Sequence, residues 1–243
     1  MQLAVCPSPA LYPYYEKSDT VIVVDVFRAS TSLCAMLANG ANAVIPVADI
    51  ATAERYKTDG FLVGAERNAR KCSFADFGNS PFDYSSNSVR GRVVVFTTTN
   101  GTQAIETASN CRRLYIGTFA NINAVAQKCI EENAKKIMVL CAGWNNRINV
   151  EDMLFAGAFA EKLSAQKEIM TCCDSVFISS NLWNVAKEDV ASYLKETEHY
   201  KRLINNHSEK DISFCLQHNS FSVVPEYNKD KRELLSANLH TKS

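Results

Sequence analysis

The chain has 243 residues, 47% of them hydrophobic, and its 26 Lys and Arg residues balance its 26 Asp and Glu residues. This length and composition predict a globular protein with a sizeable core and exclude a disordered chain. The net charge of zero argues against a nucleic-acid partner, because binding a phosphate backbone needs a clustered excess of basic residues. The apolar runs are short and interrupted, so we expect no membrane partner either.

Nine cysteines are scattered along the chain without a Cys-x-x-Cys pair, and several fall within apolar patterns. This distribution predicts reduced, buried thiols. Together with an N-terminus that lacks the pattern of a signal peptide, it predicts a cytoplasmic protein. No two of the four histidines have the spacing of a zinc site, so we expect no histidine-based metal centre. They are His199, His207, His218 and His240.

The first two-thirds of the chain alternates short β-branched runs with helical patterns. Residues 20–26 (TVIVVDV) form a continuous apolar run, which is typical of a strand buried on both faces. Further strands are predicted at 43–47, 61–63, 92–96, 114–116 and 136–141, and helices at 30–39, 50–58, 102–109, 121–133 and 150–163. This βαβα order predicts an α/β fold, layered α/β/α with a mixed, partly parallel sheet.

The last third of the chain is less regular. Residues 187–200 have a helical pattern, 212–216 and 222–224 suit strands or loops, and the tail after Pro225 is polar. We expect one domain over the whole chain, with any subdomain boundary falling near 165–180.

Polar residues follow the predicted strand at 20–26, and ligands of open α/β sheets bind beyond the carboxyl ends of strands. Asp25 is placed to hold a divalent cation, and Arg28 to bind a phosphate through two parallel hydrogen bonds. The structural alternative is an internal ion pair between Asp25 and Arg28. Phosphatases of the haloacid dehalogenase type need a second Asp two residues after the first. Phe27 stands there instead, which argues against that class.

A second polar junction, residues 97–102 (TTTNGT), lies between a predicted strand and a predicted helix. Such a turn presents free N–H groups to an anion at the positive end of the helix dipole. It lacks the Gly-Lys-Ser/Thr of a nucleotide-binding loop. The alternative is a capping turn in which Asn100-Gly101 supplies positive φ angles. Three consecutive threonines followed by Thr102 exceed what capping needs, so we favour an anion site.

Acidic residues gather at two further places. Glu151 and Asp152 begin the predicted helix at 150–163, where they are either first-turn acids or metal ligands. The polar stretch 66–91 is too long for an ordinary connection, so we interpret it as functional or as a small subdomain. It brings Glu66 and Asp76 next to a Gly-Asn-Ser-Pro turn, and no helix accounts for these acids, which suits a hard cation.

Together these segments resemble the 2-phosphosulfolactate phosphatase family in order and rough spacing from residue 21 to 163, with a weaker echo at 211–215 and 224–225. Two departures from the family pattern leave the loop geometry open: alanines flank the Glu-Arg pair, and Asp83 stands where Glu is more usual. The motifs that carry the resemblance are Asp25-Val26-Phe27-Arg28-Ala29, Glu66-Arg67, Gly78-Asn79-Ser80-Pro81, Thr98-Thr99-Asn100-Gly101-Thr102, Cys141-Ala142-Gly143 and Glu151-Asp152.

The resemblance implies hydrolysis of 2-phospho-3-sulfolactate to sulfolactate and phosphate with Mg²⁺. In this hypothesis Asp25, Arg28 and Glu66 are catalytic, and the nucleophile is either metal-activated water or a carboxylate. The expected metal ligands are Asp25, Glu66, Asp76, Glu151 and Asp152. The expected substrate contacts are Arg28, Arg67, Asn79, Ser80, Thr98, Thr99, Asn100, Gly101 and Thr102.

Two other interpretations stay open at this point. One is a phosphoanion-binding protein that hydrolyses nothing, and the other is a phosphatase for another small acidic or sugar phosphate. The presence of every expected acidic ligand argues against the first. The expected partner is in each case a small acidic phosphorylated metabolite, and a homodimer is the default expectation for a metabolic enzyme.

Overall fold

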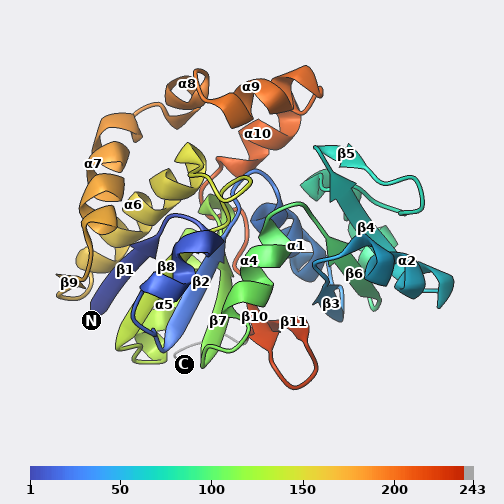
Figure 1. The fold of residues 1–243 in the computed structure, drawn as a ribbon, viewed down its shortest axis with the longest axis horizontal. Coiled ribbons are helices and arrows are strands. Elements are labelled where there is room, and N and C mark those ends of the chain that lie inside the picture. Colours follow the sequence, from blue (N-terminus) through green and yellow to red (C-terminus); the bar gives the residue numbers. More distant parts are fainter. Residues whose placement is uncertain (238–243) are drawn as a thin grey trace.

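The structure is a computed structural model that describes residues 1–237, and it contains one eleven-stranded sheet with helices on both faces (Figure 1). The strand order is β5-β4-β6-β3-β11-β10-β7-β2-β8-β1-β9. The strands are β1 (Gln2–Cys6), β2 (Thr20–Val24), β3 (Ala43–Pro46), β4 (Leu62–Arg67), β5 (Arg70–Lys71), β6 (Val93–Thr97), β7 (Arg113–Gly117), β8 (Lys136–Cys141), β9 (Met170–Thr171), β10 (Val224–Asn228) and β11 (Glu233–Ala237).

The α-helices are α1 (Ala29–Ala38), α2 (Ile50–Thr58), α3 (Ser86–Val89), α4 (Gly101–Ala108), α5 (Ile122–Glu131), α6 (Val150–Ser164), α7 (Asp174–Ala186), α8 (Val190–Leu194), α9 (Glu198–Asn205) and α10 (Glu209–Cys215). Short 3-10 helices cover Pro9–Tyr14, Pro81–Asp83 and Phe119–Asn121. No helix within residues 1–237 combines the length and the apolar character needed to cross a membrane.

Two groups of parallel strands make up most of the sheet. One group is β4-β6-β3 and the other is β7-β2-β8-β1-β9. The antiparallel hairpin β10–β11 lies between them and meets each group through one residue pair, Glu226 with Tyr115 and Leu234 with Val44. The predicted α/β class and the mixed, partly parallel sheet are therefore confirmed.

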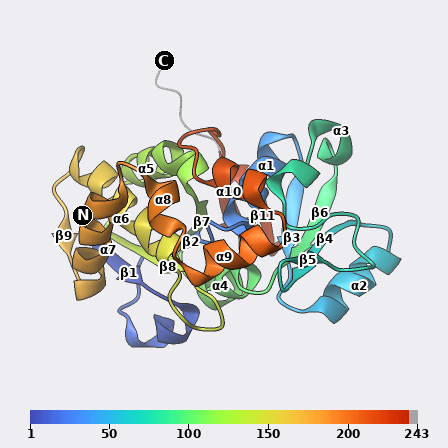
Figure 2. The ribbon, with the colours of Figure 1, turned by 90° about the horizontal axis from the view of Figure 1, so that it is seen from above.

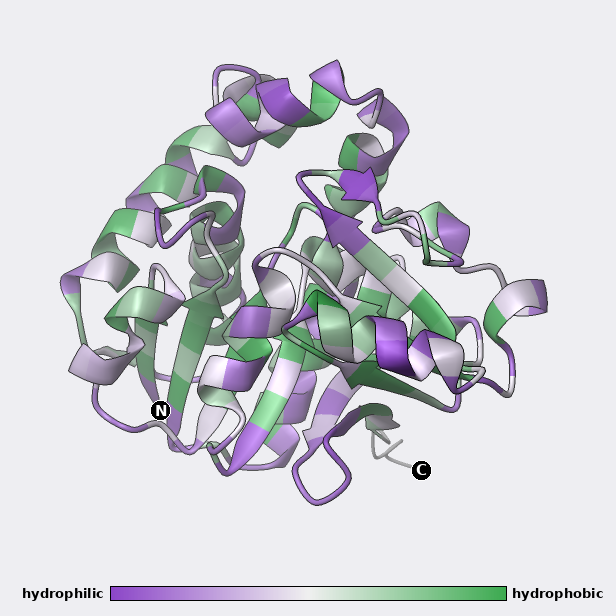
Figure 3. Ribbon diagram, turned by 45° about the vertical axis from the view of Figure 1, so that its right-hand side comes forward, coloured by the Kyte–Doolittle hydropathy of each residue, from purple (hydrophilic) through white to green (hydrophobic). Residues whose placement is uncertain are grey.

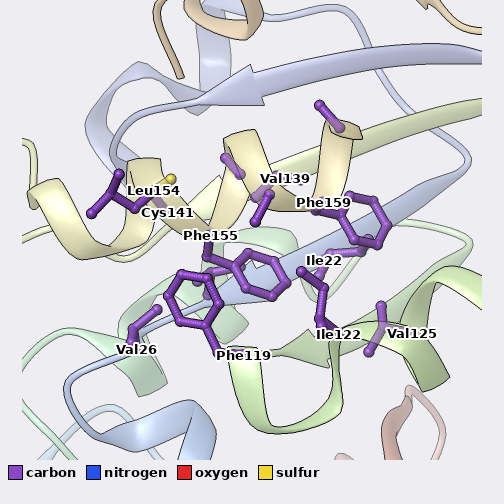
Figure 4. Packing of buried hydrophobic residues seen from close by; sticks show 14 of the residues in the cluster. Ile22, Val26, Phe119, Ile122, Val125, Val139, Cys141, Leu154, Phe155 and Phe159 are labelled. Atoms are coloured by element: carbon purple, nitrogen blue, oxygen red, sulfur yellow. The ribbon is translucent and has the colours of Figure 1, made fainter. Parts of the chain in front are cut away.

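Strand β2 shows why the fold has three layers. All five of its residues are buried, and they alternate between two cores. Ile22 and Val24 pack with α5, α6 and α7, whereas Val21 and Val23 pack with α1 and α4. Figure 4 shows the first core, where the rings of Phe119 and Phe155 meet edge to face with centroids 5.7 Å apart. Figure 3 shows apolar residues concentrated in the parallel strands of the sheet.

Several elements differ from the sequence prediction. Strand β1 was not predicted, and neither was the hairpin β10–β11, whose polar residues suit its half-exposed positions. The segment predicted as strand or loop at 212–216 belongs to helix α10, whose buried Ile212 and Cys215 lie three positions apart on one helical face. The helix predicted over 187–200 is two helices, because the Thr197 side chain caps a new one by accepting a hydrogen bond from the Tyr200 N–H.

The polar segment after β4 and the region near residue 170 have defined structures. Strand β4 continues to Arg67 and turns back into β5, and the rest of the segment holds the turn at Pro81–Asp83 and helix α3. Strand β9 pairs with β1 at the edge of the sheet. All nine cysteines are free, and five of them are buried. His240 lies outside the described residues.

Helices α8, α9 and α10 form an arm across the end of the sheet. Figure 2 shows α9 and α10 lying over the middle of the molecule, between the half that contains β1 and β8 and the half that contains β4 and β6. This arm brings residues 190–215 against loops from the first two-thirds of the chain. The candidate site lies beneath it.

Candidate active site

One pocket lies where the loops after β2, β4, β6 and β8 meet helix α9. Strands from both parallel groups therefore contribute to a single site. Seven of the residues predicted to bind metal or substrate line this pocket: Asp25, Arg28, Glu66, Asn79, Thr98, Thr99 and Asn100. Their meeting confirms the expectation that polar strand ends converge.

Asp25 follows β2 and is 8% exposed. One of its carboxylate oxygens, Oδ1, accepts a hydrogen bond from the Ala29 N–H at 3.4 Å. Burial raises the pKa of Asp25 to about 6, against the opposing effects of His199 and the Ala29 N–H, and the negative charges of Glu151 and Glu66 add to the rise. A buried carboxylate among other acids is an environment that a bound cation would stabilise.

Gly101, at the start of α4, lets that helix approach Asp25 closely. A Cβ atom added to Gly101 would lie 2.8 Å from the Asp25 Oδ2 atom and 2.7 Å from the Ala29 Cβ atom. Asn100 has a φ of −124°, and Gly101 is not among the described residues with positive φ. The capping-turn alternative based on positive φ is therefore wrong, and the glycine is explained by close approach instead.

The loop between β6 and α4 also carries an unpaired polar group. The hydroxyl oxygen of Thr98 is buried and has no hydrogen-bond partner among the described residues, although it lines the pocket. The same holds for the side-chain carbonyl oxygen of Asn79. Buried polar atoms are nearly always paired, so two such atoms on one pocket favour a polar ligand there.

Arg28 does not pair with Asp25, as the structural alternative proposed. Its Nη1 atom lies 2.5 Å from the Asp211 Oδ2 atom of α10, and both side chains are more than nine-tenths buried. Asp211 also accepts a hydrogen bond from the Ser80 hydroxyl at 2.7 Å. The peptide bond between Phe27 and Arg28 is cis. Arg28 and Ser80 are thus tied to the arm through one buried carboxylate.

Glu66 is the second-to-last residue of strand β4 and lies on another wall of the pocket. Its Oε1 atom accepts hydrogen bonds from the Ala69 N–H and, at 3.5 Å, from the Thr99 hydroxyl. Asn68 and Ala69 have φ angles of 55° and 63°, so the turn after β4 folds back over this carboxylate.

Two predicted residues from the same polar segment point elsewhere. Arg67 donates to the Ala48 carbonyl and the Thr97 hydroxyl, at 3.1 and 2.9 Å. Asp76 lies 2.6 Å from the Lys57 amine, and its other oxygen accepts a hydrogen bond from the Val63 N–H at 2.9 Å. The structure therefore does not bring Arg67 or Asp76 into the pocket.

Glu151 and Asp152 lie behind the pocket and are both 1% exposed. Asp152 accepts hydrogen bonds from the Val26 N–H at 2.9 Å and the Gly143 N–H at 3.1 Å, so it joins the loops after β2 and β8. The Oε1 atom of Glu151 lies 2.5 Å from the Nδ1 atom of His199, while its Oε2 atom is buried without a hydrogen-bond partner in residues 1–237. His199 itself lines the pocket.

Thr102 turns its hydroxyl back onto the carbonyl of Thr98, at 3.0 Å. Neither Thr102 nor Gly101 contributes to the lining, so both support the turn rather than face the pocket.

Arg202 and Trp144 also line the pocket, although neither was predicted to be a site residue. The guanidinium carbon of Arg202 lies 4.2 Å from the centre of the Trp144 ring. Burial lowers the pKa of Arg202, and Glu66 and Glu151 oppose the shift. The ordinary pKa of a guanidinium lies far above neutral pH, so Arg202 stays charged. The spacing of His199 and Arg202, three apart on α9, would have been the signal of a shared face.

The acidic residues do not form a closed metal cage. Within residues 1–237, no group of three or more His, Cys, Asp or Glu side chains is arranged to hold a metal ion. Asp76 and Asp152 use both carboxylate oxygens in other contacts. Asp25 and Glu66 still face one pocket, and Mg²⁺ in enzymes is commonly held by one or two carboxylates together with water and substrate phosphate. The pocket fits that looser mode of binding.

Comparison with known proteins gives a consistent picture. The family model described as 2-phosphosulpholactate phosphatase matches residues 6–230. A protein of Thermotoga petrophila named probable 2-phosphosulfolactate phosphatase is 35% identical over 206 residues, covering 85% of this chain and 88% of that protein. Proteins with the same name from Pseudothermotoga lettingae and Clostridium novyi are 36% and 30% identical, covering 86% and 88% of this chain and 90% and 92% of their own lengths. This chain belongs to the 2-phosphosulpholactate phosphatase family.

Proposed function

We propose that the protein is a Mg²⁺-dependent phosphatase that hydrolyses 2-phosphosulfolactate to sulfolactate and phosphate. The observation that carries the proposal is the meeting of seven predicted site residues in one pocket, in a chain whose family match extends from residue 6 to 230. The names of the relatives support the same substrate.

A phosphate monoester resists hydrolysis because its negative charge repels a nucleophile, so catalysis depends on neutralising and positioning the phosphoryl group. Asp25 and Glu66 would hold Mg²⁺, which would supply that neutralisation. The unpaired Thr98 hydroxyl and the N-terminus of α4 are available to donate hydrogen bonds to phosphoryl oxygens. Asn79, on the same pocket, can orient the group through its side-chain amide.

Asp25 is the residue best placed to start the reaction. Its carboxylate lies on the pocket and can take a proton from an attacking water molecule. It can also attack the phosphorus atom directly, with the substrate alkoxide leaving and the phosphoryl group carried on Asp25 until water releases it. Stereochemistry at phosphorus separates the two routes: one direct displacement by water inverts the configuration of an isotopically chiral phosphoryl group, whereas two successive displacements through Asp25 retain it.

The test of the proposal is phosphate release from 2-phosphosulfolactate, with Mg²⁺ or with EDTA, beside a panel of sugar phosphates. We expect release with Mg²⁺, its loss in EDTA, and a kcat/KM for sugar phosphates at least about tenfold lower, corresponding to one lost charged hydrogen bond. Equal activity on sugar phosphates would move the assignment to a general phosphatase. Binding of the substrate without any phosphate release would make the protein a phosphoanion-binding protein.

A further inference from the structure

Two arginines line the pocket, and their environments differ. Arg28 is neutralised by Asp211 at 2.5 Å. Arg202 has no carboxylate oxygen within 4.0 Å of its guanidinium in the described part of the chain, and its Nε atom is buried without a hydrogen-bond partner. The cation of Arg202 is therefore available to a ligand.

The loop after β8 is built to present Trp144 to this arginine. Trp144 and Arg147 exchange two backbone hydrogen bonds of 2.9 Å, which close a tight turn. Gly143 has a φ of 59°, and a Cβ atom there would lie 2.2 Å from the Arg147 carbonyl oxygen, so only glycine suits this position. The turn fixes the Trp144 ring beside the pocket.

Two arginines contact the Trp144 ring. The guanidinium of Arg202 lies 4.2 Å from the ring centre, and that of Arg147 lies 4.5 Å from it. Arg147 pairs with Glu198 at 3.7 Å, has a side chain 60% exposed and does not line the pocket. The two residues thus share one stacking partner but differ in access to the site.

Stacking fixes the plane of a guanidinium and leaves its N–H groups free in that plane, where they can bind a carboxylate or sulfonate through two parallel hydrogen bonds. Arg202 comes from the arm, whereas Asp25 and Thr98 come from strand ends. Because residues from the strand ends and from α9 line the same pocket, one substrate molecule can place its phosphoryl group against the strand ends and a second oxyanion against α9.

We propose that Arg202, stacked on Trp144, binds an oxyanion on the body of the substrate, carboxylate or sulfonate, and so makes the enzyme specific for phosphorylated acids. This inference rests on the proposed phosphatase function. It assigns specificity, not the chemical step, to the arm. Arg202 is accordingly a substrate-binding residue whose loss spares substrates that have no second charge.

The test compares Arg202→Gln with Arg147→Gln on three Mg²⁺-activated substrates: 2-phosphosulfolactate, 2-phospholactate, which lacks the sulfonate, and glycerol 2-phosphate, which has a neutral body. We expect Arg202→Gln to lower kcat/KM for 2-phosphosulfolactate by about 10- to 100-fold, the range for a charged hydrogen bond. Glycerol 2-phosphate should be hydrolysed within about twofold of the wild-type rate, since its contacts do not include Arg202. Arg147→Gln should leave the hydrolysis of 2-phosphosulfolactate and of glycerol 2-phosphate unchanged. Arg202→Lys should lower kcat/KM for 2-phosphosulfolactate less than Arg202→Gln does.

The measurements with 2-phospholactate show which oxyanion of the substrate Arg202 binds. A loss equal to that for 2-phosphosulfolactate assigns the carboxylate to Arg202, and no loss assigns the sulfonate. An equal loss on all three substrates, or none on any, would overturn the inference while leaving the phosphatase function intact.

Calorimetric binding of sulfolactate and of inorganic phosphate to the same variants gives a readout independent of turnover. Arg202→Gln should weaken sulfolactate binding and leave phosphate binding unchanged. If the wild-type protein releases no phosphate from any substrate, the proposed function fails, and sulfolactate binding still decides the role of Arg202. Absence of sulfolactate binding to the wild type would then overturn that role as well.

Discussion

The two sides of the pocket differ in how they are built. The strand-end side consists of short loops that continue directly from β2, β4 and β6, so its residues are held by the sheet itself. The other side is α9, part of an arm of short helices joined to the body through a few specific contacts, such as Arg28 with Asp211 and His199 with Glu151. The proposals above assign the chemical step to the side fixed by the sheet and substrate choice to the side fixed by the arm.

The largest effect is expected at the strand-end side. Asp25→Asn should reduce kcat by at least about 10³-fold, because a neutral amide neither holds a cation nor acts as base or nucleophile. Phosphate release and far-UV circular dichroism check this outcome. Asp76→Asn is the matched control: Asp76 contacts Lys57 outside the pocket, so its loss should leave kcat within about threefold of wild type. Equal losses in the two variants would contradict the site described above.

A smaller loss is expected from Gly101→Ala. The added Cβ atom would lie 2.8 Å from the Asp25 Oδ2 atom, so α4 or Asp25 must shift, at a cost of about 1–3 kcal/mol in stability. We expect kcat to fall about 10²-fold, since displacement of a reacting group by about 1 Å has this effect.

Gly60→Ala provides the comparison for Gly101→Ala. Gly60 has a φ of 87° with no atom within 4 Å of an added Cβ, so alanine there should cost about 1 kcal/mol in stability without loss of activity. Urea denaturation and kcat measured on both variants separate the two effects. Activity loss in Gly60→Ala would show that stability alone controls the rate.

The smallest catalytic effect is expected where the arm meets the body. Asp211→Asn leaves Arg28 buried without its counter-charge, so the free energy of unfolding should fall by about 3 kcal/mol, while kcat falls only about tenfold. Lys201→Met removes an exposed pair with Glu196 on the same arm and should cost less than about 1 kcal/mol. If kcat falls as much in Asp211→Asn as in Asp25→Asn, the arm takes part in the chemical step, which contradicts the proposed difference between the two sides of the pocket.

The sequence predicted the parts of the fold that depend on local patterns. The predicted strand at 136–141 and the predicted helix at 50–58 have the bounds of β8 and α2. Such elements are predictable because the pattern of a buried strand or a capped helix lies within residues that are adjacent in the sequence. The hairpin β10–β11 is different. It holds central places in the sheet with polar, half-buried residues such as Glu226 and Tyr227, whose pairing with distant strands leaves no local pattern.

The site residues also divide into those that a local sequence pattern predicts and those that depend on the path of the chain. Asp25, Glu66 and Thr98 were predictable because each lies at or just after the carboxyl end of a strand, and strand ends meet at one edge. Their neighbour Arg67 could not be separated from them, since only the structure shows its guanidinium bonded to Ala48 and Thr97. His199 and Arg202 reach the pocket by the path of the arm, which no local pattern encodes.

The central hairpin also has a consequence for biosynthesis. A ribosome makes residues 1–223 before strands β10 and β11, yet these two strands join the parallel groups that contain β7 and β3. The two halves of the sheet, and with them the two sets of loops around the pocket, are therefore linked through the sheet only after residue 237 has left the exit tunnel. Nascent chains shorter than this carry both sides of the candidate site without the two strands that link them within the sheet.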